Sequence, residues 1–225
     1  MIVCHPKKLI FIKTKKVGGT SLEIALSGFC GPDCIITPFS KVDEEARMQL
    51  GSRGPQNYLN SPVSAFLTRR ERKFRNHTRA DQARRRLPRK IWQNYRKFTI
   101  VRNPYDRAIS RYIWNHKRNL TGKLNFGEYF EENPHILTDN MRIAPLHGRN
   151  SLDIYLRFEH LEEDMFSNDL GFLWEVFQKQ TAKGGNRPFR GQDAEELYTQ
   201  FPRVLEIIED VCQEEIEKFG YHRPV

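Results

Sequence analysis

The sequence predicts an α/β fold, in which helices flank a central, mainly parallel β-sheet as three layers. Two observations favour this fold class. Short, mostly apolar runs at residues 9–12 and 98–101 are typical of buried parallel strands, and a further strand is expected at residues 154–158. The first two runs lead directly into segments with helix-start signals, and strands that alternate with helices usually form a parallel sheet. Because 225 residues suffice for one sizeable core, we expect residues 1–225 to form a single domain.

The first quarter of the chain is predicted to contain two strands and two helices. Residues 9–12 form the first strand, since this apolar run is bounded by lysines. A glycine loop follows at residues 17–21, and the helix after it is expected to end near Gly28, because glycine favours a helix C terminus. A second short strand is expected at residues 35–37, and an acidic helix at residues 43–50.

The middle of the chain combines a long connection with a strongly basic segment. Residues 51–62 are rich in Gly, Pro, Asn and Ser, which predicts a loop. Residues 69–97 carry thirteen Lys and Arg against two acids, a net charge of +11 that exceeds the +9 of the whole chain. Such a concentration indicates either an anionic partner or solvated helix surfaces. Within it, Thr78 and Asp81 resemble a helix-start box, so we expect a helix from there to about Leu87.

The clearest strand of the chain lies at residues 98–101. Arg102 and Asn103 end it, and Pro104 is suited to the first turn of a helix. We expect this helix to pack on the sheet, because its apolar and aromatic residues recur at helical spacing. These residues are Tyr105, Ile109, Tyr112 and Ile113.

The last part of the chain is predicted to add one strand and one long helix. The strand lies at residues 154–158. The helix spans residues 193–219, is amphipathic and ends at Gly220. This order of elements continues the alternation of strands and helices.

The composition gives no sign of a membrane segment or of a metal site. No apolar run approaches the 18 or so residues that a membrane helix needs, and residues 9–12 are too short for a signal peptide. We therefore expect a cytoplasmic protein without a membrane span. The four cysteines show neither C-x-x-C spacing nor a nearby histidine pattern, so we expect reduced, partly buried thiols. They are Cys4, Cys30, Cys34 and Cys212.

The first candidate site is the loop between the first strand and the first helix. Backbone amides at a helix N terminus hold phosphate well, glycines let the backbone approach an anion, and lysine adds a positive charge. The residues that could serve are Lys15, Lys16, Gly18, Gly19, Thr20 and Ser21. The loop is not a Walker A sequence, because its lysines precede the glycines, so it does not indicate a magnesium site.

The second candidate site follows the strand at residues 98–101. Arg102 ends that strand, and Ser110 lies eight residues later on the next helix, where guanidinium and hydroxyl can reach one phosphate. Together the two segments resemble the nucleotide-binding elements of sulfotransferases that use 3′-phosphoadenosine 5′-phosphosulfate (PAPS). Among these the chain is most similar to the carbohydrate-modifying type, in a soluble, bacterial-like form.

The resemblance implies a P-loop-like fold and a role for each matching residue. The loop residues Lys15 to Ser21 would receive the 5′-phosphosulfate, and Arg102 and Ser110 the 3′-phosphate. Arg187 matches the closing region of the family, which also contacts the nucleotide. The family usually has proline where this chain has Lys15, so the loop is expected to bend differently or to hold one extra charge.

The resemblance also implies the reaction. PAPS would donate a sulfuryl group to an acceptor hydroxyl, with 3′-phosphoadenosine 5′-phosphate as the product and without a metal. A carbohydrate, and an anionic one in particular, is a candidate acceptor. Lys16 would stabilise the charge that builds on the leaving phosphate oxygen. His77 is the candidate base, since residues 74–78 resemble the place where some glycan-modifying members carry a catalytic histidine.

Several alternatives remain open at this point. The base could instead be an acid after the second strand, namely Asp43, Glu44 or Glu45. The chain could be a nucleotide kinase of related P-loop architecture, which the missing Walker lysine disfavours. It could also be a non-catalytic module that binds an anionic ligand through residues 69–97. Nucleic acid is the less favoured ligand there, because that segment lacks regularly interleaved aromatic residues. The oligomeric state is left open.

Overall fold

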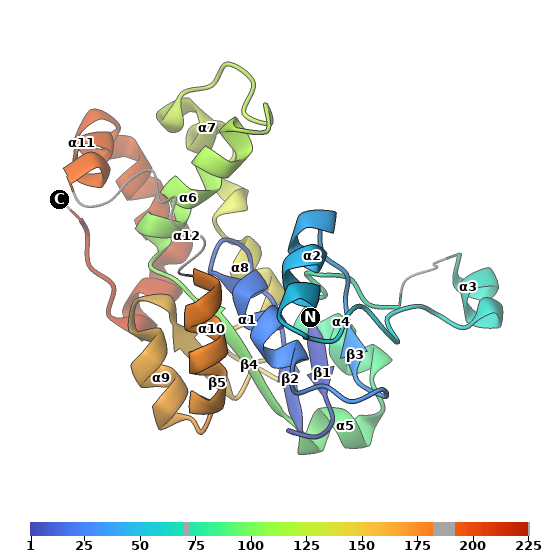
Figure 1. Cartoon of the computed structure of the whole chain (residues 1–225). Coiled ribbons are helices and arrows are strands. Elements are labelled where there is room, and N and C mark those ends of the chain that lie inside the picture. The colour runs from blue at the N-terminus through green and yellow to red at the C-terminus, as the bar shows by residue number, and fades with distance from the viewer. Residues whose placement is uncertain (70–72, 182–191, 225) are drawn as a thin grey trace.

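The computed structural model describes residues 1–69, 73–181 and 192–224. A five-stranded sheet crosses the molecule, with helices on both of its faces (Figure 1). The α/β prediction is therefore confirmed. The strands are β1 (Ile2–Cys4), β2 (Leu9–Phe11), β3 (Ile35–Ile36), β4 (Arg96–Val101) and β5 (Ile154–Arg157).

The sheet is mixed, so the prediction of a mainly parallel sheet is wrong. The strand order is β3-β1-β2-β4-β5. β2 pairs in parallel with β4, and β4 with β5, but β1 runs antiparallel to both of its neighbours. The reason is a strand that the sequence did not reveal: residues 2–4 turn back through a short hairpin and insert between β2 and β3. So short a connection can join only antiparallel strands.

The helices of the first half are α1 (Gly19–Ser27), α2 (Lys41–Gln49), α3 (Pro62–Thr68), α4 (Ala80–Arg86) and α5 (Arg89–Asn94). Of these, α1, α2 and α4 correspond to predicted helices, whereas α3 and α5 were not predicted. α2 begins two residues early, because the Ser40 side chain accepts a hydrogen bond from the Asp43 amide. The predicted start box at Thr78 is wrong. The Thr78 hydroxyl instead closes a turn with the amide and carbonyl of Arg75, at 2.7 and 2.8 Å, and α4 starts after it.

In the second half of the chain, one predicted helix proves to be two separate helices. Pro202 cannot continue the hydrogen bonding of a helix, so the segment predicted as one helix forms α11 and α12, which end and begin on either side of Phe201. α12 ends at Gly220 as predicted. No helix in the described ranges is both long and apolar enough to cross a membrane. The helices are α6 (Pro104–His116), α7 (Phe126–Glu132), α8 (Asp139–Ile143), α9 (Leu161–Ser167), α10 (Trp174–Thr181), α11 (Gln192–Gln200) and α12 (Pro202–Phe219).

Three apolar clusters hold these elements together. Helices α1, α9 and α10 cover one face of the sheet, with Phe11 and Phe98 in contact beneath them. Helices α4, α5 and α8 cover the other face, around Ile10 and Trp92. The third cluster joins α6, α7, α11 and α12. α6 therefore leaves the sheet as part of a helical layer of its own.

A buried ion pair fixes α6 against α12. The Arg107 guanidinium contacts both carboxylate oxygens of Glu215, at 2.5 and 2.7 Å. Both side chains are almost inaccessible to solvent. A paired arrangement of this kind is needed to bury two charges, and breaking it leaves one of them unpaired. The pair thus holds the helix whose other face borders the site described next.

Candidate active site

The predicted glycine loop connects β2 to α1 and has an unusual backbone. Lys16 and Gly18 both adopt left-handed conformations, with φ of 62° and 74°. A lysine in this region costs about 1 kcal/mol or more and is maintained only where its surroundings require it. No side chain in the described part of the chain caps the N terminus of α1. The first-turn amides of α1 are thus available to an anion.

Side chains from distant elements hold the loop in place. Asn140 of α8 accepts a hydrogen bond from the Lys15 amide at 2.8 Å and donates one to the Lys15 carbonyl at 3.0 Å. The Lys15 ammonium lies 2.6 Å from Asp139. Arg102 donates to the carbonyl of Lys16 at 3.2 Å. The extra charge expected at Lys15 is therefore already paired with an acid of α8, and the residue anchors the loop.

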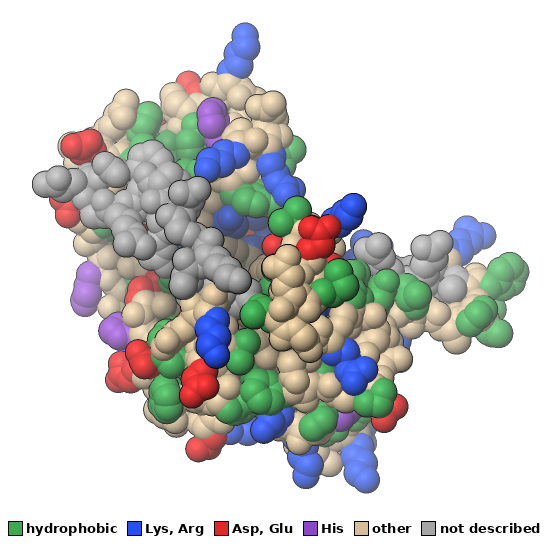
Figure 2. Space-filling model, in the orientation of Figure 1, with side chains coloured by type: hydrophobic (Ala, Val, Ile, Leu, Met, Phe, Trp, Pro, Cys, Tyr) green, Lys and Arg blue, Asp and Glu red, His purple; other side chains and the backbone are tan. Residues whose placement is uncertain are grey.

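A cleft of about 580 Å³ opens beside this loop. Figure 2 shows Lys and Arg side chains gathered around the hollow between α2 and the α6 side of the molecule. The cleft is lined by every loop residue predicted to bind the nucleotide and by two of the four candidate bases. These are Lys15, Lys16, Gly18, Gly19, Thr20, Ser21, His77 and Asp43.

Lys16 is the most strongly perturbed cation of the cleft. Burial, together with the positive charges of Arg102 and Arg111, lowers the pKa of its ammonium to about 8. Its Nζ lies 5.2 Å from the centre of the Trp114 ring. An anion in the cleft would favour the charged form of Lys16 and would itself be stabilised there.

His77 is held in the form that a general base needs. Its Nδ1 lies 3.0 Å from the carbonyl oxygen of Lys13. A carbonyl can only accept, so Nδ1 carries the proton in the neutral ring and the lone pair is on Nε2. Burial lowers the pKa of His77 to about 4. The ring is therefore neutral at neutral pH, and burial contributes more to this than the nearby positive charges do.

The three acidic alternatives are not equivalent. Asp43 lines the cleft and accepts a hydrogen bond from the Ser40 hydroxyl at 2.7 Å. Glu44 instead pairs with Arg47, at 3.0 and 3.1 Å, and Glu45 is exposed outside the cleft lining. Of the three, only Asp43 is in a position to act at the same place as His77.

Arg102 and Ser110 are not among the residues that line this cleft. Arg102 lies behind the loop, with its guanidinium 5.0 Å from the centre of the Phe158 ring. A second hollow of about 530 Å³ lies beside Phe158 and is bordered by Trp174 and Phe177. Ser110 is half-buried on α6. Arg187 lies outside the described residues.

The cleft also contains residues that sequence reasoning missed. Arg111, Trp114 and Arg118 line it from α6 and the turn just after it. Arg111 is followed by Trp114 three residues later and by Arg118 seven residues later, so the three lie on one helical face. This pattern was missed because only the face with Tyr105, Ile109, Tyr112 and Ile113 was considered. Asn76 lies next to His77. Its Oδ1, like the Nε of Arg111, is buried without a hydrogen-bond partner in the described part of the molecule, so both can serve a ligand.

The basic segment does not form the wall of this cleft. Among the described residues of the segment, 69 and 73–97, only Asn76 and His77 line it. Several of its cations pair with acids, since Arg79 and Arg85 both contact Asp81 and Lys97 contacts Asp153, at 2.7 to 2.9 Å. The positive charge at the cleft thus comes from the loop and from α6.

One comparison with known proteins identifies the chain. A family model described as the sulfotransferase family matches residues 1–222. No curated protein and no solved structure matches the chain significantly. The match extends over nearly the whole sequence and includes both predicted nucleotide-binding segments.

Proposed function

The chain belongs to the sulfotransferase family and so transfers sulfuryl groups, and we propose that its donor is PAPS and its acceptor a hydroxyl bound in the Lys16 cleft. The observation that carries this proposal is the meeting of three features in one cleft. They are the free amides at the start of α1, the Lys16 ammonium and the neutral imidazole of His77. An anion-binding loop beside a general base is what transfer of an anionic group to a hydroxyl requires.

The two hollows on either side of the loop suggest how the donor lies. The 5′-phosphosulfate binds at the amides of Gly19, Thr20 and Ser21. The 3′-phosphate is bound by Arg102 and Ser110, and the family resemblance adds Arg187, which lies outside the described residues. Because Arg102 stands against Phe158, we place the adenosine in the aromatic hollow beside that ring.

The reaction is an in-line displacement at sulfur. The acceptor oxygen forms a bond to sulfur while the bond from sulfur to the 5′-phosphate oxygen breaks. The leaving oxygen gains negative charge, which Lys16 stabilises, and Nε2 of His77 takes the hydroxyl proton. Because Lys16 acts on charge that develops during the step, removal of its ammonium lowers kcat more than it weakens donor binding.

His77 is the favoured base, and Asp43 is the alternative. A pKa of about 4 makes His77 a weak base in the free protein, but the negative charge of a bound donor raises it. The two residues are separated by the variants His77→Asn and Asp43→Asn, assayed for kcat with saturating donor. The proposal expects the larger loss in His77→Asn. A larger loss in Asp43→Asn would transfer the role to the carboxylate.

An anionic carbohydrate is the acceptor that fits the far side of the cleft best. Trp114 is 38% exposed, and the Arg118 guanidinium lies 4.1 Å from the centre of its ring. A flat aromatic face suits the apolar face of a sugar, while Arg118 and Arg111 suit an acidic group on it. We expect Trp114→Ala to raise the acceptor KM of uronate-bearing oligosaccharides without changing donor binding. Leu120→Ala, which removes another exposed apolar side chain near the end of α6, is the matched control.

Calorimetry of 3′-phosphoadenosine 5′-phosphate tests the donor assignment directly. We expect binding to the wild type, loss of that binding in Arg102→Ala, and much weaker binding of ATP with Mg²⁺. Arg85→Ala removes an exposed cation of the basic segment and is expected to bind as the wild type does. Absence of binding by the folded wild type would remove the basis of the donor assignment.

The same titrations separate the two competing functions. A nucleotide kinase would prefer ATP with Mg²⁺ to the 3′-phosphorylated nucleotide. A module that binds anions through residues 69–97 would lose affinity in Arg85→Ala, retain it in Lys16→Ala, and depend steeply on salt. For the sulfotransferase we expect Arg85→Ala to bind as the wild type does, and Lys16→Ala to lose some affinity and a larger share of its kcat.

A further inference from the structure

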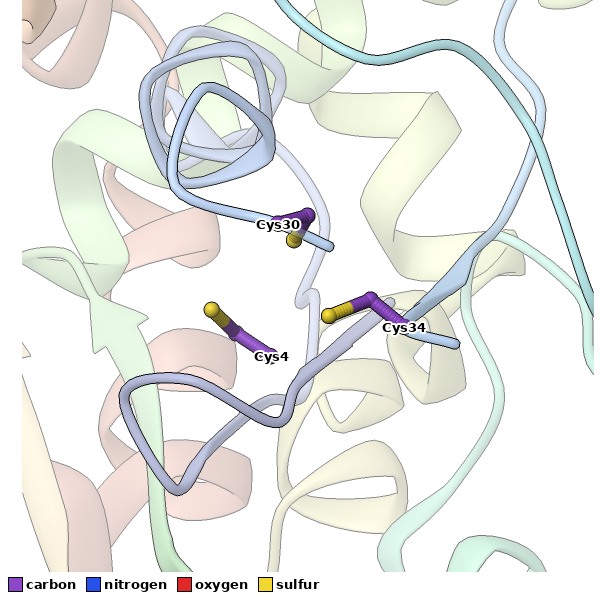
Figure 3. Close-up of side chains that lie close together, drawn as sticks. All are labelled: Cys4, Cys30 and Cys34. Atoms are coloured by element: carbon purple, nitrogen blue, oxygen red, sulfur yellow. The ribbon is translucent and has the colours of Figure 1, made fainter. Parts of the chain in front are cut away.

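Three of the four cysteines meet at one point outside the cleft. Cys4 ends β1, Cys30 follows α1, and Cys34 directly precedes β3. Their sulfur atoms all lie within 4.8 Å of one another, and Figure 3 shows the three side chains lying close together. All three are free thiols, as the sequence predicted, but their spacing in the chain gave no sign of the cluster.

The geometry suits one bound metal ion. Sulfur ligands lie about 2.3 Å from zinc, which separates neighbouring sulfurs by about 4 Å. No two of the three sulfurs are more than 4.8 Å apart, so a single ion can reach all of them. Cys4 and Cys34 are inaccessible to solvent, and Cys30 is 8% exposed.

The surroundings of Cys34 favour negatively charged sulfur. Sγ of Cys34 accepts two backbone hydrogen bonds, from the amides of His5 and Gly31, each at 3.2 Å. Two donors on one sulfur stabilise a thiolate. Sγ of Cys4 and Sγ of Cys30 instead donate to the carbonyl oxygens of Phe29 and Leu26, each at 3.5 Å, so full deprotonation of the cluster needs a cation.

We propose that Cys4, Cys30 and Cys34 bind a single thiophilic d¹⁰ cation, Cu⁺ or Zn²⁺, as a trithiolate site. Thiolate sulfur selects these ions over harder cations. Each thiol releases its proton to solvent and donates an electron pair to the metal, and no oxidation or reduction takes place. Within the described residues no fourth His, Cys, Asp or Glu ligand joins the group, so Cu⁺ would be three-coordinate and Zn²⁺ would take a water.

The site is structural and stands apart from sulfuryl transfer. α1 has nine residues, about 13 Å at 1.5 Å per residue, and the cleft lies at its N terminus while Cys30 follows its C terminus. A metal ion here would tie the hairpin that precedes β2 to the end of α1. It would therefore steady the helix whose first turn binds the donor.

The test uses the full chain, reduced and freed of metal by a chelator. Zn²⁺ is titrated against a chromophoric chelator, and Cu⁺ against a Cu⁺-specific chelator without oxygen, while native mass spectrometry counts the bound ions. We expect one equivalent of at least one of the two ions and a rise in the melting temperature of the metal-bound protein. The ion that binds with the lower dissociation constant in these two titrations is identified as the ligand of the site.

Matched variants assign the ligands. Cys4→Ser, Cys30→Ser and Cys34→Ser are each expected to weaken binding by about 100-fold or more, while Cys212→Ser, which changes a buried cysteine beside Arg107, should bind as the wild type does. If a cluster variant does not fold, X-ray absorption of the metal-bound wild type decides, because it counts the sulfur neighbours. Absence of one-to-one binding, unchanged affinity in Cys34→Ser, or a metal shell without sulfur would each overturn the proposal.

Discussion

The protonation of His77 makes a quantitative prediction about stability. In the folded protein burial holds its pKa at about 4, whereas an unfolded histidine titrates near its ordinary value of about 6.5. Between these values the unfolded chain binds a proton that the folded protein does not. The free energy of unfolding therefore falls as the pH falls from 6.5 towards 4. Above pH 6.5 both states are neutral at this site, and the contribution vanishes.

The size of the effect follows from the two pKa values. The histidine should cost about 2 kcal/mol of stability at pH 5, and about 3 kcal/mol once both states are protonated, relative to pH 7.5. His77→Asn removes the titrating group but keeps a donor near the position of Nδ1, so that the carbonyl of Lys13 stays paired. The variant should thus be less sensitive to acid than the wild type by about 2 kcal/mol at pH 5.

Urea unfolding at pH 7.5, 6 and 5 measures this difference. The wild type and His77→Asn are compared at each pH, and His222→Asn, which changes an exposed histidine near the C terminus, should follow the wild type. Parallel pH dependence of the wild type and His77→Asn would refute the reasoning. It would mean that the ring is solvated and lacks the buried bond to Lys13.

Three further predictions concern the loop and its support. In the wild type, kcat/KM for the donor should fall above pH 8, because Lys16 loses its proton there. In Lys16→Arg the same fall should move beyond pH 10, because arginine stays protonated. Rates measured across this pH range at limiting donor concentration test both expectations. Gly18→Ala should destabilise the protein by about 1–2 kcal/mol and weaken donor binding in calorimetry, because the left-handed backbone disfavours a side chain and the new Cβ would lie 2.9 Å from Phe158. Unchanged affinity would count against the loop geometry. Glu215→Gln should lower the free energy of unfolding by about 3–5 kcal/mol, since it leaves Arg107 buried and unpaired. The surface variant Glu206→Gln should lower it by no more than about 1 kcal/mol in the same urea titration.

The sequence predicted the features that depend on local signals. The β2 strand, the glycine loop and α1 follow one another within residues 9–27, and the start of α6 is fixed by Asn103 and Pro104. Each was predictable because apolar runs, glycines and capping residues act on their own neighbours. The position of the glycine loop between a strand and a helix could therefore be predicted from the sequence, while its role in binding the donor stays a prediction.

The features that depend on distant partners could not be predicted in this way. β1 is only three residues long, and its place between β2 and β3 is set by pairing across the sheet rather than by its own pattern. Thr78 has the residue type of a cap, but its hydroxyl is already used by Arg75. Arg111 was overlooked because its importance lies in the face of α6 that meets the loop, which only the packing of α6 decides.

The hydrogen bonds between the Asn140 side chain and the Lys15 backbone have a consequence for folding during synthesis. These two residues are 125 positions apart, and their two hydrogen bonds join the loop to α8. Contacts of such long range form late, since a long segment must first be brought into place. When only β2, the glycine loop and α1 have left the ribosome, every residue of the loop is present. The side chains of α8 that hold the loop in place have not yet been synthesised. We therefore expect the nascent chain to acquire affinity for the donor only after α8 has emerged and docked.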